Sequence, residues 1–254
     1  GEVRVSGGSR VFGTGWFYND AAGTLSQTNS GETSIATRFI NTGTIRADAG
    51  YLRFSGGGFT SYEGRLHVGA GAAISLERDE YEFPFDTPRI TGPGTVTVRE
   101  GGTFDLKVPL ALDQATLTIC GGTMSASVDA QITGSGTFSL SNGAVLRGLL
   151  PVRTRTKILG NTTIENGGVL RFEPQGSSQI SIEADGLVLD GQGAVEVWDS
   201  TIAKLGTGAS TIGVAFTHTG TTGGIDVQSG TLDMTGLFSS SGTLAKDGPG
   251  ALVV

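Results

Sequence analysis

The chain has 254 residues, enough for one large domain with a continuous apolar core. Its 43 glycines and its low share of charged residues, 16%, indicate an all-β protein, because turns are abundant and solvated helical faces are scarce. The formal charge of −7 argues against a nucleic-acid or anionic-membrane partner, and no stretch approaches the ~18 apolar residues of a membrane span. The single cysteine, Cys120, cannot form an internal disulfide, and the opening GEVRV, without Met or a signal-peptide pattern, suggests a mature or excised piece.

Short apolar segments recur at a fixed interval near the N-terminus. FINTGTI at 39, GYLRF at 50, GRLHV at 64 and GAAISL at 71 share one pattern, in which Gly43 and Gly64 lie 21 residues apart. Alternation of apolar with polar residues is the period of a β-strand. The interval therefore predicts one structural unit every 21 or so residues.

The next segment, ERDEYEFPFDTPRI at 77–90, interrupts this register and is expected to be an inserted loop. Aromatic rings interleaved with carboxylates suit sugar recognition, since a ring stacks on the pyranose face while carboxylates accept hydroxyl protons; they suit protein contacts as well. The structural alternative is a loop whose rings shield a coil edge. The candidate ligand-binding residues are Asp79, Glu80, Tyr81, Glu82, Phe83, Phe85 and Asp86.

The middle of the chain shows the period most clearly. GTVTV at 94, ATLTI at 115 and GTFSL at 136 start 21 residues apart, so Val96, Leu117 and Phe138 are predicted to stack on one another. Second and third strands complete each unit, with a predicted stack of Phe104, Met124 and Val145 in the second and Val128 in the third. Residues 1–254 are therefore predicted to form one single-stranded parallel β-helix, right-handed like other parallel crossovers.

The polar positions of the same three segments form two columns of hydroxyl groups. Such columns resemble the Thr-x-Thr face of ice-binding solenoids, whose regular spacing can match an ice lattice. Threonine is also a favoured strand residue, so a purely structural ladder is the alternative. The ladder consists of Thr95, Thr116 and Thr137 beside Thr97, Thr118 and Ser139.

The remaining candidates for chemistry are isolated. His67 and His218 belong to no metal or nucleophile motif and are expected to point outward. Arg153, Arg155 and Lys157 alternate in one segment, which fits either a small anion-binding patch or a solvated face. We expect no catalytic residue, no metal and no cofactor.

Both ends of the chain resemble known bacterial surface proteins. FINTGTIRADAGYLRFSGG from 39 and FTHTGTTGGIDVQSGTLDMTG from 216 resemble their Gly/Thr-rich repeats. LAKDGPGALVV at 244–254 is similar to the passenger-associated repeat of autotransporters, with Ala251 where that family favours Thr. The resemblance covers residues 39–76 and 216–254 most clearly, and it implies a secreted or cell-surface β-helix such as an adhesin stalk or passenger.

The sequence thus predicts a non-catalytic structural and interaction segment of a bacterial secreted or cell-surface adhesin-like protein. Its expected partners are surface glycans or proteins of host or neighbouring cells, and end-to-end association of the solenoid is a further expectation. The alternative is a carbohydrate-active β-helix enzyme, a polysaccharide lyase or glycoside hydrolase. It would require Glu63 or Glu77 to converge with Asp79, Glu80 or Glu82 in a groove. Ice binding is the third reading.

Overall fold

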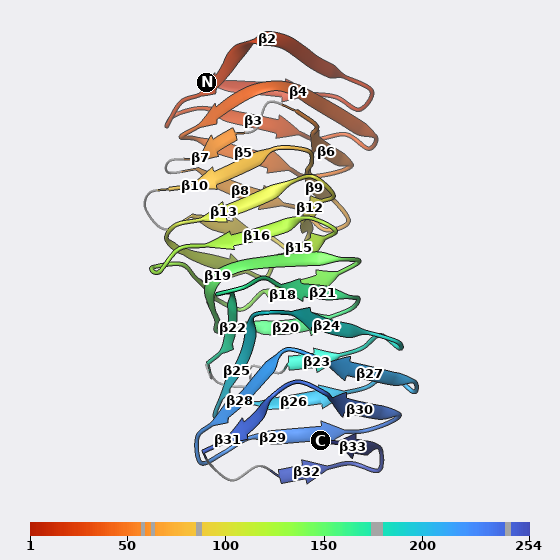
Figure 1. Cartoon of the computed structure of the whole chain (residues 1–254). Coiled ribbons are helices and arrows are strands. Elements are labelled where there is room, and N and C mark those ends of the chain that lie inside the picture. Colours follow the sequence, from red (N-terminus) through yellow and green to blue (C-terminus); the bar gives the residue numbers. More distant parts are fainter. Residues whose placement is uncertain (57–58, 62–63, 85–87, 174–179, 242–244) are drawn as a thin grey trace.

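The computed structural model describes residues 1–56, 59–61, 64–84, 88–173, 180–241 and 245–254, with backbone alone at 59–61 and 245. These residues form strands and turns wound into a parallel β-solenoid of about 11 turns, with about 22 residues in each (Figure 1). The two termini lie at opposite ends of the solenoid. The described residues contain no helix that could cross a membrane. The prediction of an all-β, parallel β-helix is therefore confirmed.

Each coil contributes one strand to each of three columns, and the ladders between described strands are parallel. The first column contains β1 (Glu2–Val5), β3 (Thr24–Gln27), β5 (Thr44–Ala47), β8 (Arg65–Val68), β11 (Arg89–Thr91), β14 (Pro109–Asp113), β17 (Gln131–Thr133), the end of β19 (Ala144–Val152), β22 (Val169–Phe172), β25 (Ala194–Trp198), β28 (Ala215–Thr219) and β31 (Phe238–Ser240).

The second column contains the first halves of β2 (Arg10–Asn19) and β4 (Glu32–Asn41), then β6 (Tyr51–Phe54), β9 (Ala73–Leu76), β12 (Thr95–Arg99), β15 (Thr116–Cys120), β18 (Thr137–Ser141), β20 (Arg155–Ile158), β23 (Ile180–Ile182), β26 (Thr201–Lys204), β29 (Gly224–Val227) and β32 (Ala245–Asp247).

The third column contains the second halves of β2 and β4, then β7 (Phe59–Ser61), β10 (Glu80–Phe83), β13 (Thr103–Leu106), β16 (Thr123–Ala126), the start of β19, β21 (Thr162–Ile164), β24 (Val188–Gly191), β27 (Ala209–Ile212), β30 (Thr231–Met234) and β33 (Ala251–Val253).

The core is a set of stacked apolar side chains inside the three columns. Val96, Leu117 and Phe138 pair in register across three coils, as predicted, and each is 0% exposed. Full burial of such a side chain contributes about 1.5–3 kcal/mol. Because the same apolar profile repeats in each coil, the buried residues form one continuous cluster along the solenoid.

The predicted stack in the third column is wrong at one position. Met124 pairs with Leu146, which is fully buried, whereas Val145 pairs with Thr123 and is half-buried. The turn that follows Ser141 is one residue longer than the turn that follows Cys120, although these two residues pair with each other. One extra residue exchanges the inward and outward faces of the following strand.

Two further residues lie on the opposite side from the expected one. Val128 is 84% exposed in the turn before β17, and Ile132 takes the buried position that was expected of it. His218 is 0% exposed and occupies an inward position of β28, in register with Val197, whereas an outward position was expected. His67 is half-buried, and its Nδ1 lies 3.0 Å from the Thr91 hydroxyl.

The segment expected to be an inserted loop contributes two strands to the solenoid. Its Glu80–Phe83 stretch is β10, which pairs residue by residue with β13, and its end belongs to β11. The reason is its own alternation, since a Glu-Tyr-Glu-Phe pattern is half apolar and half polar like the Thr-Phe-Asp-Leu pattern of β13. The Phe83 and Phe104 rings stack inside with their centroids 4.3 Å apart.

Candidate functional site

Three neighbouring hollows of the described surface form one elongated depression, which we call the corner groove. It runs over the outward face of the second column and its corner with the third, where hollows of about 440, 370 and 950 Å³ follow one another. Arg53 lines all three of these hollows, which makes them parts of one groove. The charged residues that line it are Arg10, Glu32, Arg53, Glu77, Arg78, Arg99 and Glu100.

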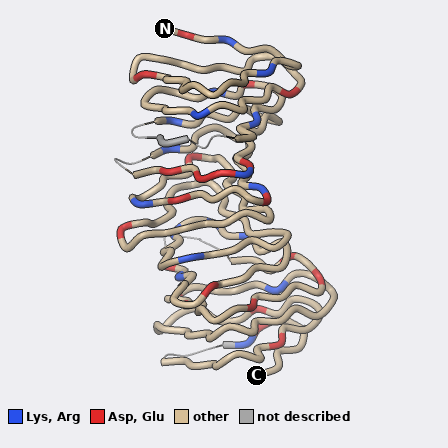
Figure 2. Tube along the Cα trace, turned by 45° about the horizontal axis from the view of Figure 1, so that its top comes forward, with Lys and Arg blue, Asp and Glu red and all other residues tan. Residues whose placement is uncertain are grey.

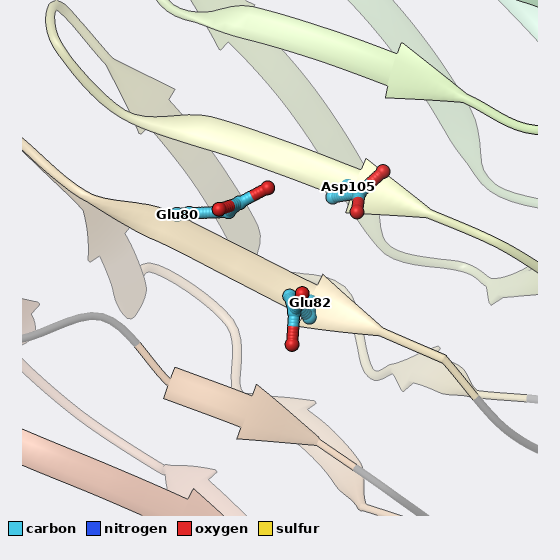
Figure 3. A group of neighbouring side chains, drawn as sticks. All are labelled: Glu80, Glu82 and Asp105. Carbon is cyan, nitrogen blue, oxygen red and sulfur yellow. The ribbon is translucent and has the colours of Figure 1, made fainter.

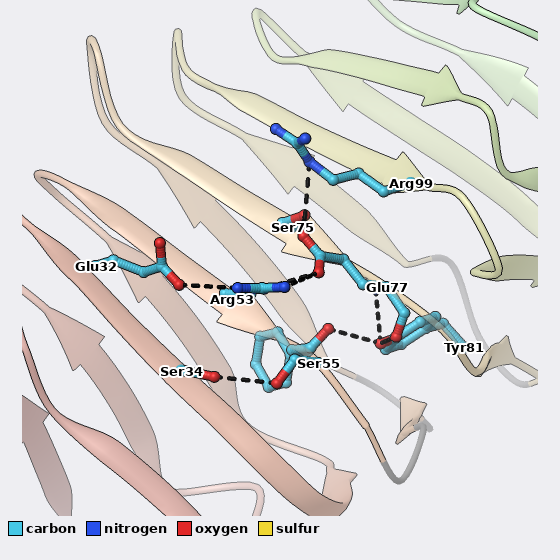
Figure 4. Close-up of polar contacts among 9 residues, drawn as sticks. Glu32, Ser34, Arg53, Ser55, Ser75, Glu77, Tyr81 and Arg99 are labelled. Carbon is cyan, nitrogen blue, oxygen red and sulfur yellow. Dashed lines mark hydrogen bonds and ion pairs between the residues drawn. The ribbon is translucent and has the colours of Figure 1, made fainter.

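Opposite charges alternate along the floor of the corner groove, one from each successive coil (Figure 4). The Arg53 guanidinium lies between two carboxylates, with Nη1 3.3 Å from Glu32 Oε1 and Nη2 2.7 Å from Glu77 Oε2. Arg99 approaches the other oxygen of Glu77, with Nε 3.6 Å from Oε1. This row of ion pairs links four successive coils and holds the four charged side chains in place.

Glu77 is held on every side. It is 7% exposed, and the Ser75 hydroxyl donates to its Oε1 at 2.9 Å. From inside the solenoid, the Tyr81 hydroxyl accepts the Glu77 backbone N–H at 2.9 Å and lies 2.8 Å from the Glu77 carbonyl and 2.9 Å from the Phe54 carbonyl. Burial raises the pKa of Tyr81, so the phenol stays protonated and remains a donor. Tyr81 therefore fixes the backbone at Glu77 from inside the solenoid.

Arg78 follows Glu77 at the corner and has an unusual backbone. Its φ of 62° is left-handed, whereas the corners of the next two coils have glycines there, Gly101 at 78° and Gly121 at 72°. A non-glycine residue in this region is strained. The Arg78 side chain is exposed and lines two of the three hollows.

Charged residues elsewhere on the solenoid are mostly paired between coils, and Figure 2 shows both signs distributed along its length. Arg147 lies 2.8 Å from Glu165, Arg153 lies 2.6 Å from Glu173, and Arg171 lies 2.7 Å from Glu196. The Arg147 guanidinium holds the pKa of Glu165 below its usual value. Such pairs lock neighbouring coils in register and leave little net charge.

Four arginines are different, because no ion pair, hydrogen bond or aromatic ring engages their guanidiniums in the described structure: Arg10, Arg65, Arg78 and Arg155. All four are exposed. Arg10 and Arg78 line the same hollow of about 440 Å³, whereas Arg65 and Arg155 line none of the three hollows of the corner groove. Two of the four free guanidiniums therefore share one hollow of the corner groove, whose lining also carries the exposed carboxylate of Glu100.

Three carboxylates gather on the outward face of the third column (Figure 3). Oxygens of Glu80, Glu82 and Asp105 lie within 4.8 Å of one another on the paired strands β10 and β13. Lys107 is already among them, with Nζ 3.2 Å from Asp105 and 3.4 Å from Glu82. The hydrogen bond to Asp105 raises the pKa of Lys107, so this ammonium neutralises part of the cluster. A divalent cation would compete with it.

The residues that the sequence proposed for a ligand-binding loop do not share one face. Glu80 and Glu82 point outward from β10, and the Asp79 carboxylate accepts the Glu80 backbone N–H in the preceding turn at 3.0 Å. Tyr81 and Phe83 point into the core, where they are 0% and 1% exposed and offer no ring to a ligand. Strand alternation separates the rings from the carboxylates. The sequence also proposed Phe85 and Asp86, which lie outside the described residues.

The hydroxyl ladder has the predicted register. Thr95 pairs with Thr116 and then with Thr137, and the second row of hydroxyls runs in parallel from Thr97 through Thr118 to Ser139. Ser75 extends this second row by one coil, but both Ser75 and Ser139 are buried, at 0% and 2% exposure. On the next coil Arg155 and Lys157 take the two positions. The regular hydroxyl surface therefore ends after three coils.

The corner groove was not among the sites proposed from the sequence. Its signal was present, since Glu32, Arg53 and Glu77 alternate in sign at intervals of 21 and 24 residues, close to one coil. The acid convergence required by the enzyme reading is not seen at Glu77, which pairs with two arginines; Glu63 lies outside the described residues. Comparisons with protein-family models, with curated proteins and with solved structures found no match to this chain.

Proposed function

We propose that the chain is a non-catalytic structural and interaction segment of a bacterial secreted or cell-surface adhesin-like protein, in which a stiff solenoid displays a binding surface outside the cell. Its partners are surface glycans or proteins of host or neighbouring cells. The observation that carries this proposal is the corner groove, an open charged depression on an otherwise regular rod. The Gly/Thr-rich repeats at both ends of the chain support the placement at the cell surface.

The architecture supports the structural half of the proposal. Each coil adds about 4.8 Å of length, and the continuous core and cross-coil ion pairs oppose bending between coils. A repeat protein of this kind gains length without changing its surface chemistry from one coil to the next. Such a rod is suited to holding a binding face away from the surface that carries it.

The state of Glu77 supports the non-catalytic half. A general acid or base must exchange a proton with a bound substrate and needs free approach to the reacting atom. The Glu77 side chain is instead only 10% exposed, and its carboxylate is engaged by Arg53, Arg99 and Ser75. The groove holds fixed charges that can recognise a ligand. Its most buried carboxylate, that of Glu77, already pairs with two arginines and a serine hydroxyl.

Incubation of the chain with a panel of neutral and acidic polysaccharides tests the proposal. We expect binding to intact cells or immobilised glycans, with no new reducing ends and no unsaturated product. Product formation that Glu77→Gln abolishes would show an enzyme instead, provided that Glu165→Gln keeps the activity. Glu165 is a suitable control because it also sits in a cross-coil ion pair, with Arg147, away from the corner groove.

A further inference from the structure

We propose that the corner groove binds a linear anionic polysaccharide laid along the solenoid axis, with the guanidiniums of Arg10 and Arg78 as its principal anion contacts and Arg99 as a further one. This inference rests on the proposed interaction role of the segment and names the class of ligand for it. It follows from where the free positive charge lies, from the backbone of Arg78 and from the mixture of groups that surrounds both.

The positive charge of the chain is mostly engaged outside the corner groove. The chain carries a net charge of −7, and arginines such as Arg147, Arg153 and Arg171 pair with a carboxylate of a neighbouring coil. Arg10 and Arg78 have no such partner among the residues that the structure describes, and they line one hollow of about 440 Å³ together with Arg53. Arg99 makes a 3.6 Å contact with Glu77 and lies over the Tyr51 ring, and its side chain is 52% exposed. An anion in the groove would gain these contacts without breaking the Arg53–Glu77 pair.

The backbone of Arg78 supports the same binding site. A left-handed corner is favourable for glycine and strained for arginine, and the next coils use Gly101 and Gly121 there. The Tyr81 hydroxyl contacts the backbone N–H and the carbonyl of Glu77, the residue before Arg78, and also the Phe54 carbonyl, so the core fixes the strained corner. The core holds Arg78 in a strained conformation that leaves its guanidinium free of partners in the described structure. This arrangement fits a ligand-binding residue better than a residue that only connects two strands.

Hydroxyl groups, a carboxylate and an aromatic ring surround the free guanidiniums. The hydroxyls of Ser34 and Ser55 lie 3.0 Å apart in the same hollow, and Glu32 stands beside them. The Tyr51 ring lines the adjoining hollow under the Arg99 guanidinium, 5.9 Å away. Guanidiniums recognise carboxylates or sulfate esters, while carboxylates and hydroxyls pair with sugar hydroxyls. A nucleic acid has phosphates but few such hydroxyls, so it would leave the carboxylates and serine hydroxyls of the groove without hydrogen-bond partners.

The shape of the corner groove fits an extended ligand. The hollows extend from Arg10, the first residue of β2, to Asn142 after β18. Six strand-to-strand steps separate these strands in the second column, which at about 4.8 Å each gives roughly 29 Å of groove. A depression of this length that is open along its side accepts a chain running through it, whereas a single small anion would occupy one end only.

The test is a binding titration by biolayer interferometry with the whole chain. The probes are polygalacturonate for carboxylates, dextran sulfate for sulfate esters, dextran as the neutral polymer, and polyglutamate and single-stranded DNA as the other polyanions. The groove variant is Arg10→Gln with Arg78→Asn, since asparagine tolerates the left-handed corner. The matched control is Arg65→Gln with Arg155→Gln, which removes two equally free arginines outside the groove. Circular dichroism and thermal melting confirm that both variants fold.

We expect salt-sensitive binding of polygalacturonate or dextran sulfate and none of dextran, with affinity at least about tenfold lower in the groove variant and nearly unchanged in the control variant. Equal loss in both variants, tighter binding of polyglutamate or DNA, or no binding of either acidic polysaccharide would overturn the inference. These outcomes are separable from the proposed function: absence of binding leaves a structural role in place, whereas depolymerisation of a bound polymer overturns the non-catalytic role and leaves the groove as the binding site.

Discussion

Arg53 joins three coils through its two carboxylate partners, Glu32 and Glu77. The closer contact is with Glu77, whose carboxylate lies 2.7 Å from the guanidinium and whose side chain is only 10% exposed. An ion pair between exposed side chains contributes little, about 0–1 kcal/mol, because water screens it. Removing the partner of a largely buried carboxylate costs much more stability, because the remaining charge is left without compensation. The Arg53–Glu77 pair is therefore the structural centre of the corner groove.

We expect Arg53→Gln to lower the free energy of unfolding by about 1–2 kcal/mol, a value reduced from that of a fully buried pair because the Arg53 side chain is 33% exposed. Urea denaturation followed by circular dichroism measures the change. Arg147→Gln is the matched control, since it breaks an exposed pair with side chains 53% and 41% accessible, and should change stability by less than about 1 kcal/mol. Equal losses in the two variants would contradict the special status of Glu77.

Tyr81→Phe should destabilise the chain by about 1–3 kcal/mol, because the Glu77 N–H and the Phe54 carbonyl lose a buried partner. Tyr18→Phe is its control, since Tyr18 is 65% exposed. If the corner depends on the Tyr81 hydroxyl, Tyr81→Phe also weakens binding in the groove even where the protein is fully folded. Unchanged stability would show that the hydroxyl is dispensable.

Acid should weaken the coils around Asp199. The backbone N–H groups of Thr222 and Thr221 donate to its carboxylate at 3.0 and 2.8 Å, which lowers the pKa of Asp199 below its usual value. A carboxylate whose pKa is lowered by folding contributes stability above its unfolded pKa, about 3.9, and this contribution disappears as the pH falls through the lower folded value. Thermal melting from pH 6 to about pH 2 measures the loss.

Asp199→Asn provides the matched variant, since its amide oxygen can still accept the same N–H groups and asparagine tolerates the left-handed φ of 43° at this position. We expect its melting temperature to fall less steeply than that of the original chain below about pH 4. Identical acid dependence in the two proteins would mean that Asp199 does not contribute.

Replacement of the buried histidine should be tolerated or stabilising. His218 Nε2 has no hydrogen-bond partner in the described structure, and an unsatisfied buried polar atom costs about 1–3 kcal/mol. Phe172 and Val197 occupy the same inward position in the two preceding coils. We therefore expect His218→Phe to raise the free energy of unfolding by up to about 1 kcal/mol in urea denaturation. A loss above that size would show that the Nδ1 contact with Ser240, at 3.3 Å, is worth more than the unsatisfied Nε2 costs.

The sequence predicted the architecture well wherever turns keep a constant length. The pairing of Val96 with Leu117 and Phe138 follows directly from a 21-residue interval and strand alternation. The error at Val145 arises from one additional turn residue, which no pattern of apolar residues reveals. His218 was predictable, because the alternation that places Phe216 inside also places His218 inside.

The functional surface was harder to predict. The alternating aromatic and acidic residues at Tyr81 and Phe83 have the same composition in a strand as in a binding loop, and only the pairing with β13 decides between them. The corner groove depends on the left-handed backbone of Arg78 and on which arginines have no acidic partner among the described residues of the adjacent coils. Both are properties of the stacked coils and have no short sequence motif.

The most direct test of the binding groove uses Cys120, the single cysteine of the chain, which is half-buried and lines the hollow of about 950 Å³. The measurement is its rate of alkylation by iodoacetamide, a neutral reagent, with and without saturating polygalacturonate or dextran sulfate, and with dextran as the control. A polymer lying in the groove covers this thiol, so we predict that the bound acidic polysaccharide slows alkylation several-fold while dextran leaves the rate unchanged. An unchanged rate with a polymer that demonstrably binds would place the binding site elsewhere on the solenoid and contradict the account.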